Sequence, residues 1–196
     1  MFDDLIIERD PPDKRHSKCD AAMERYLPEA AVMLAYAEHL LRTLPGVTTV
    51  EIHPDGVHGK QFEIAAWLLT HGFSRRDEQL GITLYRGTYV RGQQTVVVDP
   101  RPGLGDVTAS TEALTVLAEC KGGIVNTSHA GQTSRLRKGL LEAIGQLMQK
   151  PKGGRQVAVV PNTKTTLRLA TAMAARAHDA GIYIALVDAQ GQVTDI

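Results

Sequence analysis

The residues with the clearest chemical potential end a predicted strand, residues 115–121. Side chains alternate along a strand, so Leu117, Glu119 and Lys121 share one face. Two charged groups therefore finish an otherwise apolar run, and burying them without partners would cost free energy. We expect them to reach solvent, each other or a cation. A simple ion pair at the end of the strand is the alternative.

A second carboxylate, Asp106, follows a Pro-Gly-Leu-Gly turn and begins a short β-like segment, residues 106–110. If this segment pairs with residues 115–121, the carboxylates of Asp106 and Glu119 converge at one sheet edge. Two carboxylates, a backbone carbonyl and waters form a hard-oxygen site suited to Mg²⁺, with Mn²⁺ as a substitute. Lys121 would then assist the attacking water and offset charge on a phosphorane-like transition state. The alternative is that Asp106 belongs only to a turn.

Length and composition limit the class of protein. The chain has 196 residues, of which 43% are hydrophobic and 22% charged, so it can bury a sizeable core in one domain with an appendage. This composition excludes collagen, coiled coil and wholesale disorder. There is no apolar run of about 18 residues and no usual signal peptide. Two cysteines are too few for a disulfide framework, so we expect a cytoplasmic protein with no membrane span.

The balanced net charge conceals an uneven distribution. Lys plus Arg and Asp plus Glu both total 22. Residues 60–176 contain sixteen bases and eight acids, whereas residues 1–27 contain five bases and seven acids. A basic surplus raises the local concentration of a polyanion such as nucleic acid. A solvated basic face is the alternative.

The order of predicted elements indicates an α/β protein with a central mixed β-sheet flanked by helices. Residues 1–27 are polar and contain Pro11-Pro12, which is typical of an arm or a loosely docked segment. We place a boundary between an N-terminal arm and helix, residues 1–46, and a second part, residues 47–196. Helices are expected at 28–44, 59–70, 132–148 and 165–180, and strands at 47–52, 82–90, 95–98, 106–110, 115–121, 156–160 and 182–187, with a hairpin turn at 91–94.

Four pieces of residues 58–148 stand in the order of a known family: a helix from Gly59 ending at Gly72-Phe73, then Gly105-Asp106-Val107, then Leu117-Ala-Glu-Cys-Lys-Gly122, then the helix 132–148. In these pieces the chain resembles the PD-(D/E)xK restriction-endonuclease-like nucleases. The layout is most similar to archaeal Holliday-junction resolvases and Mrr-like restriction enzymes. The resemblance implies a restriction-endonuclease-like core with the element order αβββαβ.

The resemblance also implies roles for individual residues. Asp106, Glu119 and Glu63 would bind the metal, and Lys121 would be catalytic. Gly105 stands where the family has a proline, and the reversed dipeptide Asp99-Pro100 makes Asp99 a reserve ligand. By the same analogy, Gln132 or Arg135 would contact a phosphate near the site. By their charge, Arg135, Lys138 and Lys164 would hold the nucleic-acid backbone, and a solvated basic surface is the alternative.

Together these patterns predict a Mg²⁺-dependent endonuclease that hydrolyses phosphodiester bonds, in DNA before RNA. One domain carries one site, so we expect a homodimer, or a subunit of a larger assembly, where both strands of a duplex are cut. The alternative is a catalytically silent nucleic-acid-binding or assembly subunit with the same fold. The histidines have no ligand-like spacing and are expected to be surface or capping residues.

Overall fold

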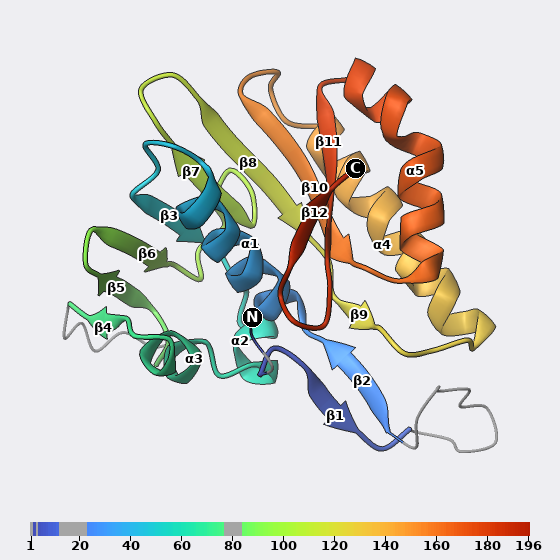
Figure 1. Ribbon diagram of the computed structural model, residues 1–196, viewed down its shortest axis with the longest axis horizontal. Helices are drawn as coiled ribbons and strands as arrows, with labels where there is room; N and C mark the ends of the chain where they lie inside the picture. The colour runs from blue at the N-terminus through green and yellow to red at the C-terminus, as the bar shows by residue number, and fades with distance from the viewer. Residues whose placement is uncertain (1, 3, 12–22, 77–83) are drawn as a thin grey trace.

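The computed structural model describes residues 2, 4–11, 23–76 and 84–196. Its main feature is a large mixed β-sheet flanked by helices (Figure 1), which confirms the predicted α/β class. In spatial order the sheet contains β12 (Val193–Asp195), β11 (Ile182–Val187), β10 (Arg155–Pro161), β8 (Thr115–Cys120), β7 (Val107–Ser110), β3 (Thr49–Ile52), β6 (Gln94–Val98), β5 (Gly87–Arg91) and β4 (Ser74–Arg75).

Helices cover both faces of this sheet. Helix α1 (Glu29–Thr43) packs on one face, and α4 (Ala130–Met148) and α5 (Lys164–Asp179) pack on the other. Alternation along β10 sends Val157 and Val159 into the core beside α1, and Ala158 and Val160 into the core beside α4 and α5. No helix in the described part of the chain is long and apolar enough to cross a membrane.

The centre of the sheet has a simple order along the chain. Helix α1 precedes β3, which is antiparallel to β7, and β7 is antiparallel to β8. Helix α4 then leads to β10, which is parallel to β8. The hairpin of β5 and β6 lies between β3 and β7 in sequence but extends the sheet on the far side of β3. Helix, three antiparallel strands, helix and parallel strand therefore form the central unit.

The described part of the N-terminal segment is anchored rather than loosely docked. Strands β1 (Ile7–Arg9) and β2 (Glu24–Leu27) pair with β9 (Gly123–Ile124) in a second, three-stranded sheet. Leu5 and Leu27 are completely buried. Helix α1 shares one hydrophobic core with the main sheet, so residues 1–46 and 47–196 are in close contact. That they are separate units stays a prediction.

The prediction of one continuous helix over residues 59–70 is wrong. The structure has a short helix α2 (His58–Gln61), a break, and then α3 (Ile64–Thr70). Phe62 and Ile64 are both buried, and residues two apart point to different sides of a helix. The chain breaks between them, and the Ile64 N–H donates to the Phe62 carbonyl oxygen at 2.9 Å.

The predicted hairpin at 91–94 is confirmed, because β5 and β6 pair with Arg91 opposite Gln94. Of the expected strand 82–90, residues 82 and 83 lie outside the described residues, and β5 begins only at Gly87. Strands β4, β9 and β12, with two to three residues each, are additional to the prediction.

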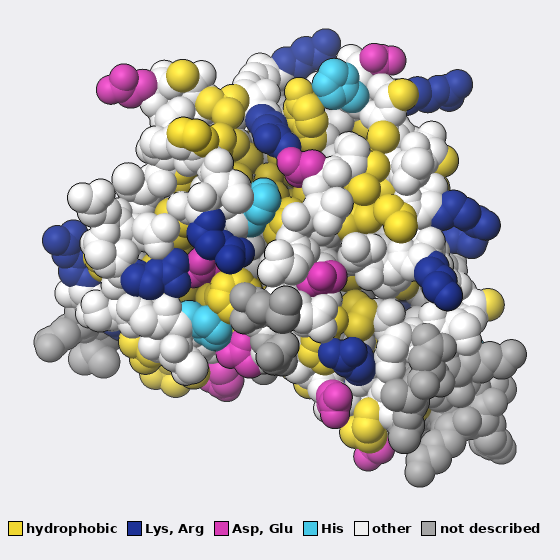
Figure 2. All heavy atoms as spheres, in the orientation of Figure 1, with side chains coloured by type: hydrophobic (Ala, Val, Ile, Leu, Met, Phe, Trp, Pro, Cys, Tyr) yellow, Lys and Arg dark blue, Asp and Glu magenta, His cyan; other side chains and the backbone are white. Residues whose placement is uncertain are grey.

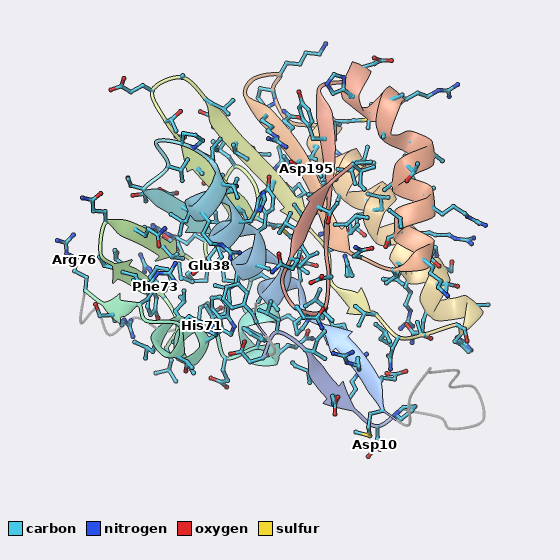
Figure 3. The ribbon with its side chains drawn as sticks, in the orientation of Figure 1. Asp10, Glu38, His71, Phe73, Arg76 and Asp195 are labelled. Atoms are coloured by element: carbon cyan, nitrogen blue, oxygen red, sulfur yellow. The ribbon has the colours of Figure 1, made fainter. Side chains whose placement is uncertain are left out.

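A buried ion pair ties α1 to this hairpin. Glu38 is only 2% exposed, and its two carboxylate oxygens each lie 2.9 Å from a terminal nitrogen of Arg91. The Arg91 guanidinium also stacks 4.2 Å from the centre of the Phe73 ring and donates to the His71 carbonyl oxygen at 3.1 Å. Figure 3 shows Glu38, His71 and Phe73 gathered beside α1. One arginine thus joins α1, the end of α3 and β5.

Candidate active site

Pairing of β7 with β8 brings Asp106 and Glu119 together. Val107 is opposite Ala118, so the residues one step further, Asp106 and Glu119, face each other at the end of the pairing. The Cys120 N–H donates to Oδ2 of Asp106 at 2.7 Å, and the His53 N–H donates to the Asp106 carbonyl oxygen at 2.9 Å. Asp106 is therefore fixed by two neighbouring strands.

Glycine at position 105 has a structural reason. A Cβ atom placed on Gly105 would lie 2.8 Å from the Ala118 carbonyl oxygen and 3.1 Å from Cγ of Leu117. Any side chain here would push β8 away from the residue before Asp106. This close approach of residue 105 to β8 explains why the position is a glycine.

The Glu119 side chain is almost buried, at 5% exposure, on the α4 side of the sheet. Burial raises the pKa of Glu119, and the nearby Asp106 carboxylate raises it further. Lys150, just after α4, provides partial compensation, with Nζ 3.4 Å from Oε1 of Glu119. Two like charges thus lie close together, with Lys150 in contact and Lys121 nearby as counter-ions, and the pKa of Glu119 is still raised, which makes an added cation electrostatically favourable.

Asp106 and Glu119 line a pocket of about 460 Å³. The side chain of Gln146 contributes an oxygen that is buried and accepts no hydrogen bond from the described residues. Within the described chain, no group of three or more His, Cys, Asp or Glu side chains is placed to hold a metal ion. The complete lining is His53, Pro102, Gly103, Gly105, Asp106, Glu119, Gln146, Gln149 and Lys150.

Lys121 lies at the end of β8 between two acidic side chains. Its Nζ is 3.5 Å from Oε1 of Glu29 and 3.8 Å from Oε1 of Glu142. Burial alone lowers the pKa of Lys121, but the surrounding carboxylates, Glu29 and Asp106 first, raise it overall. Lys121 is therefore a cation near neutral pH, suited to stabilising negative charge rather than to accepting a proton.

Glu29, the first residue of α1, was missed by the sequence interpretation. Burial raises its pKa to about 7, partly offset by Lys121 and reinforced by Asp106. The signal was available: α1 is the helix before β3, the first of the three antiparallel strands. The resemblance points instead to the helix that ends at Gly72-Phe73, and so to Glu63.

Two predicted metal ligands are not brought to this site, and Lys121 lies beside the pocket rather than in its lining. Glu63 is exposed at the residue before α3 and does not line the pocket. Asp99 forms an ion pair with Arg101, and it lies 3.9 Å from the guanidinium of Arg86. The Arg101 side chain is the main cause that holds the pKa of Asp99 at about 2. Its carboxylate is thus occupied by arginine outside the pocket.

The predicted phosphate contacts divide into two groups. Gln132 and Arg135, from the first turns of α4, line a second pocket of about 320 Å³ next to Gly122. Lys138 and Lys164 are exposed on α4 and at the start of α5. On the face drawn in Figure 2, dark blue and magenta side chains are interspersed, so the basic surplus does not form a single patch there.

His129 accepts a hydrogen bond from the Gly131 N–H and caps α4, as expected of a capping histidine. His53 lines the first pocket, and its Nδ1 lies 3.0 Å from the Arg101 carbonyl oxygen. Its position depends on the loop after β6, which sequence spacing does not predict.

Comparisons with protein-family models, curated proteins and solved structures find no match to this chain.

Proposed function

We propose that this chain is a metal-dependent nuclease that hydrolyses phosphodiester bonds in DNA. The observation that carries the proposal is the pairing of Asp106 with Glu119 across β7 and β8, beside an open polar pocket. Lys121 follows two residues later as a protonated group. Two carboxylates and a cation in this order suit phosphoryl transfer, where charge develops on oxygen.

The order of the central elements supports the same proposal. Helix α1, strands β3, β7 and β8, helix α4 and strand β10 follow the αβββαβ order that the resemblance to PD-(D/E)xK nucleases implies. On this assignment the first core helix is α1. The helical glutamate of the site would then be Glu29 rather than Glu63.

Mg²⁺ or Mn²⁺ fits the oxygen donors of the pocket. Asp106 and Glu119 would hold the ion, which would relieve the repulsion that raises the pKa of Glu119. The buried oxygen of Gln146 is a neutral donor in the wall of the same pocket. When bound, such an ion supplies Lewis acidity and makes water easier to ionise.

Lys121 would stabilise the charge that builds up on the phosphoryl oxygens. Its ammonium group is held between Glu29 and Glu142, so these carboxylates are positioning residues for the lysine. Lys138 and Lys164 would contact the nucleic-acid backbone, which follows from their charge and exposure. Because each chain offers one site, cutting both strands of a duplex would use a homodimer or two successive nicks.

A catalytically silent nucleic-acid-binding or assembly subunit is the second candidate. The observation that favours it is the contact of Lys150 with Glu119 at 3.4 Å, because an internal ammonium can substitute for a metal ion as the counter-ion of a buried carboxylate. In that case the fold would bind nucleic acid without cutting it.

The test is cleavage of supercoiled plasmid, single-stranded DNA and RNA in Mg²⁺ or Mn²⁺, with EDTA as the chelator control. Asp106→Asn and Glu119→Gln remove one charge each at nearly constant shape, and both should lose at least about 100-fold in rate. Glu112→Gln, exposed in the turn at the other end of β7 and β8, is the matched control and should cut normally. Cutting that survives in both site variants would place the activity elsewhere. A folded, inactive wild type that binds DNA would establish the silent subunit.

A further inference from the structure

The second pocket joins the N-terminal hairpin to α4. Arg9 and Tyr26 come from β1 and β2, and Gln132 and Arg135 come from the first turns of α4. The first two residues are more than 100 positions from the last two in the sequence, yet all four line one cavity of about 320 Å³. The cavity is therefore a product of the tertiary fold.

The pocket has an excess of positive charge. Arg9 stacks 4.3 Å from the centre of the Tyr26 ring, and its Nε lies 3.2 Å from Oε2 of the buried Glu24. Arg135 is exposed and has no hydrogen bond or ion pair with any described residue. Burial raises the pKa of Tyr26, so its hydroxyl remains a donor. In the structure this hydroxyl donates to Oε1 of Gln61 at 3.5 Å, which leaves Gln132 as the neutral side chain that can donate a hydrogen bond. Two arginines line the pocket, while Glu24 contacts Arg9 and Glu29 lies near Tyr26.

Close packing of glycines holds this pocket next to the candidate active site. A Cβ on Gly122 would lie 2.6 Å from the Leu27 carbonyl oxygen, and one on Gly123 would lie 2.5 Å from a methyl carbon of Leu136. The hairpin and α4 can therefore approach the chain directly after Lys121. Along α4, Arg135 is eleven residues before Gln146 of the first pocket, which is about 16 Å at 1.5 Å of rise per residue.

We propose that this pocket binds a backbone phosphate of the substrate, a few nucleotides from the bond held over Asp106 and Glu119. The inference rests on the proposed function, and it gives the N-terminal hairpin a role in binding. The Arg135 guanidinium would pair with the phosphate. Arg9, held in place by Glu24 and Tyr26, would complete the site.

The test is fluorescence anisotropy of labelled single-stranded and duplex DNA with the full chain in EDTA, so that binding is measured without cutting. Arg135→Ala should raise Kd about tenfold and lower the slope of log Kd against log salt concentration by about one. Arg176→Ala removes an exposed arginine near the far end of α5 and should stay within about twofold of wild type. The double variant Arg9→Gln/Arg135→Ala should lose less than the product of the single effects, because both groups contact one phosphate.

Three results would overturn the inference. The first is an equal loss of DNA affinity in Arg135→Ala and Arg176→Ala, and the second is that the wild type does not bind DNA. The third is saturable binding of inorganic phosphate that Arg135→Ala removes while DNA affinity is unchanged, since the pocket would then take free phosphate. Plasmid cleavage is measured separately. If the wild type cuts DNA and Arg135→Ala binds DNA as tightly as the wild type, the phosphate pocket is refuted and the nuclease is not. If the wild type cuts nothing but Arg135→Ala selectively loses DNA affinity, the pocket is supported and the nuclease is refuted.

Discussion

Helix α1 carries two shielded glutamates that are held in different ways. Glu38, in the middle of the helix, receives two contacts of 2.9 Å from Arg91. Glu29, at its first residue, lies 3.5 Å from Nζ of Lys121, and its pKa is raised to about 7. The same helix thus carries one short, two-point ion pair, the closed pair of Glu38 with Arg91, and one longer ion pair, that of Glu29 with Lys121.

The difference indicates which charges support the fold and which are available to a ligand. The closed pair holds the Glu38 carboxylate at two points, by a hydrogen bond to Oε2 and by charge at Oε1, and leaves little for another molecule. The pairs around β8 are longer, at 3.4 Å for Lys150 with Glu119 and 3.8 Å for Lys121 with Glu142. Incompletely compensated carboxylates beside a pocket are typical of functional sites.

The largest expected effect would break the closed pair. Arg91→Ala should lower the free energy of unfolding by about 3 kcal/mol, because it leaves the Glu38 carboxylate buried without its partner. Chemical denaturation measures this. The double variant Glu38→Leu/Arg91→Met should recover to within about 1 kcal/mol of wild type. A loss in the double variant as large as in the single one would mean that the pair itself, and not the stranded charge, determines the effect.

Lys121 tests the longer ion pairs around β8. Lys121→Met should slow DNA cleavage about 100-fold, because a protonated group beside the reacting phosphate is removed. Initial rates at saturating Mg²⁺ measure the effect. Lys152→Met, exposed in the linker after α4, is the control and should cut at the wild-type rate. Equal rates for both variants would remove Lys121 from the site.

Glu29 should make stability depend on pH near neutrality. Its pKa is raised from 4.5 to about 7 on folding, so its contribution is complete below about pH 4.5 and is lost as the pH rises through 7. The Glu29→Gln side chain does not ionise, so its free energy of unfolding has no such dependence on pH. Relative to the wild type, the free energy of unfolding of the variant should therefore rise by up to about 2 kcal/mol between pH 4.5 and 8. Denaturation in EDTA at several pH values measures this difference, and a constant difference would contradict the raised pKa.

The smallest expected effect is that of replacing Lys150. Lys150→Met removes the internal counter-ion of Glu119, so Mn²⁺ should bind about three- to fivefold more tightly. Titration followed by Mn²⁺ paramagnetic resonance measures this without requiring cleavage, and Lys152→Met again serves as the control. Weaker binding would instead make Lys150 a group that orients Glu119.

The sequence predicted the locally encoded parts of the molecule. The period of two in residues 115–121 and the short connection back to Asp106 correctly anticipated that Asp106 and Glu119 would converge. The long helices α4 and α5 also agree closely with their apolar periodicity.

Parts that depend on distant contacts were not predictable in the same way. Glu29 reaches Lys121 only because α1 packs on the sheet, and Lys150 reaches Glu119 only through the end of α4. Short strands such as β9 carry almost no periodicity of their own and exist because β2 lies beside them. Glu63 was predicted because its helix, ending at Gly72-Phe73, resembles the first helix of the family, and this local pattern does not show which helix packs beside β8.

The hairpin of β7 and β8 has a consequence for how the protein folds. Asp106 and Glu119 are joined by a single turn, so closing the loop between them costs little chain entropy. Glu29 and Lys150 must wait for contacts between remote parts of the chain, which form more slowly. The two repelling carboxylates are therefore expected to meet before their lysine partners arrive, and a divalent ion present during folding would speed the formation of this hairpin.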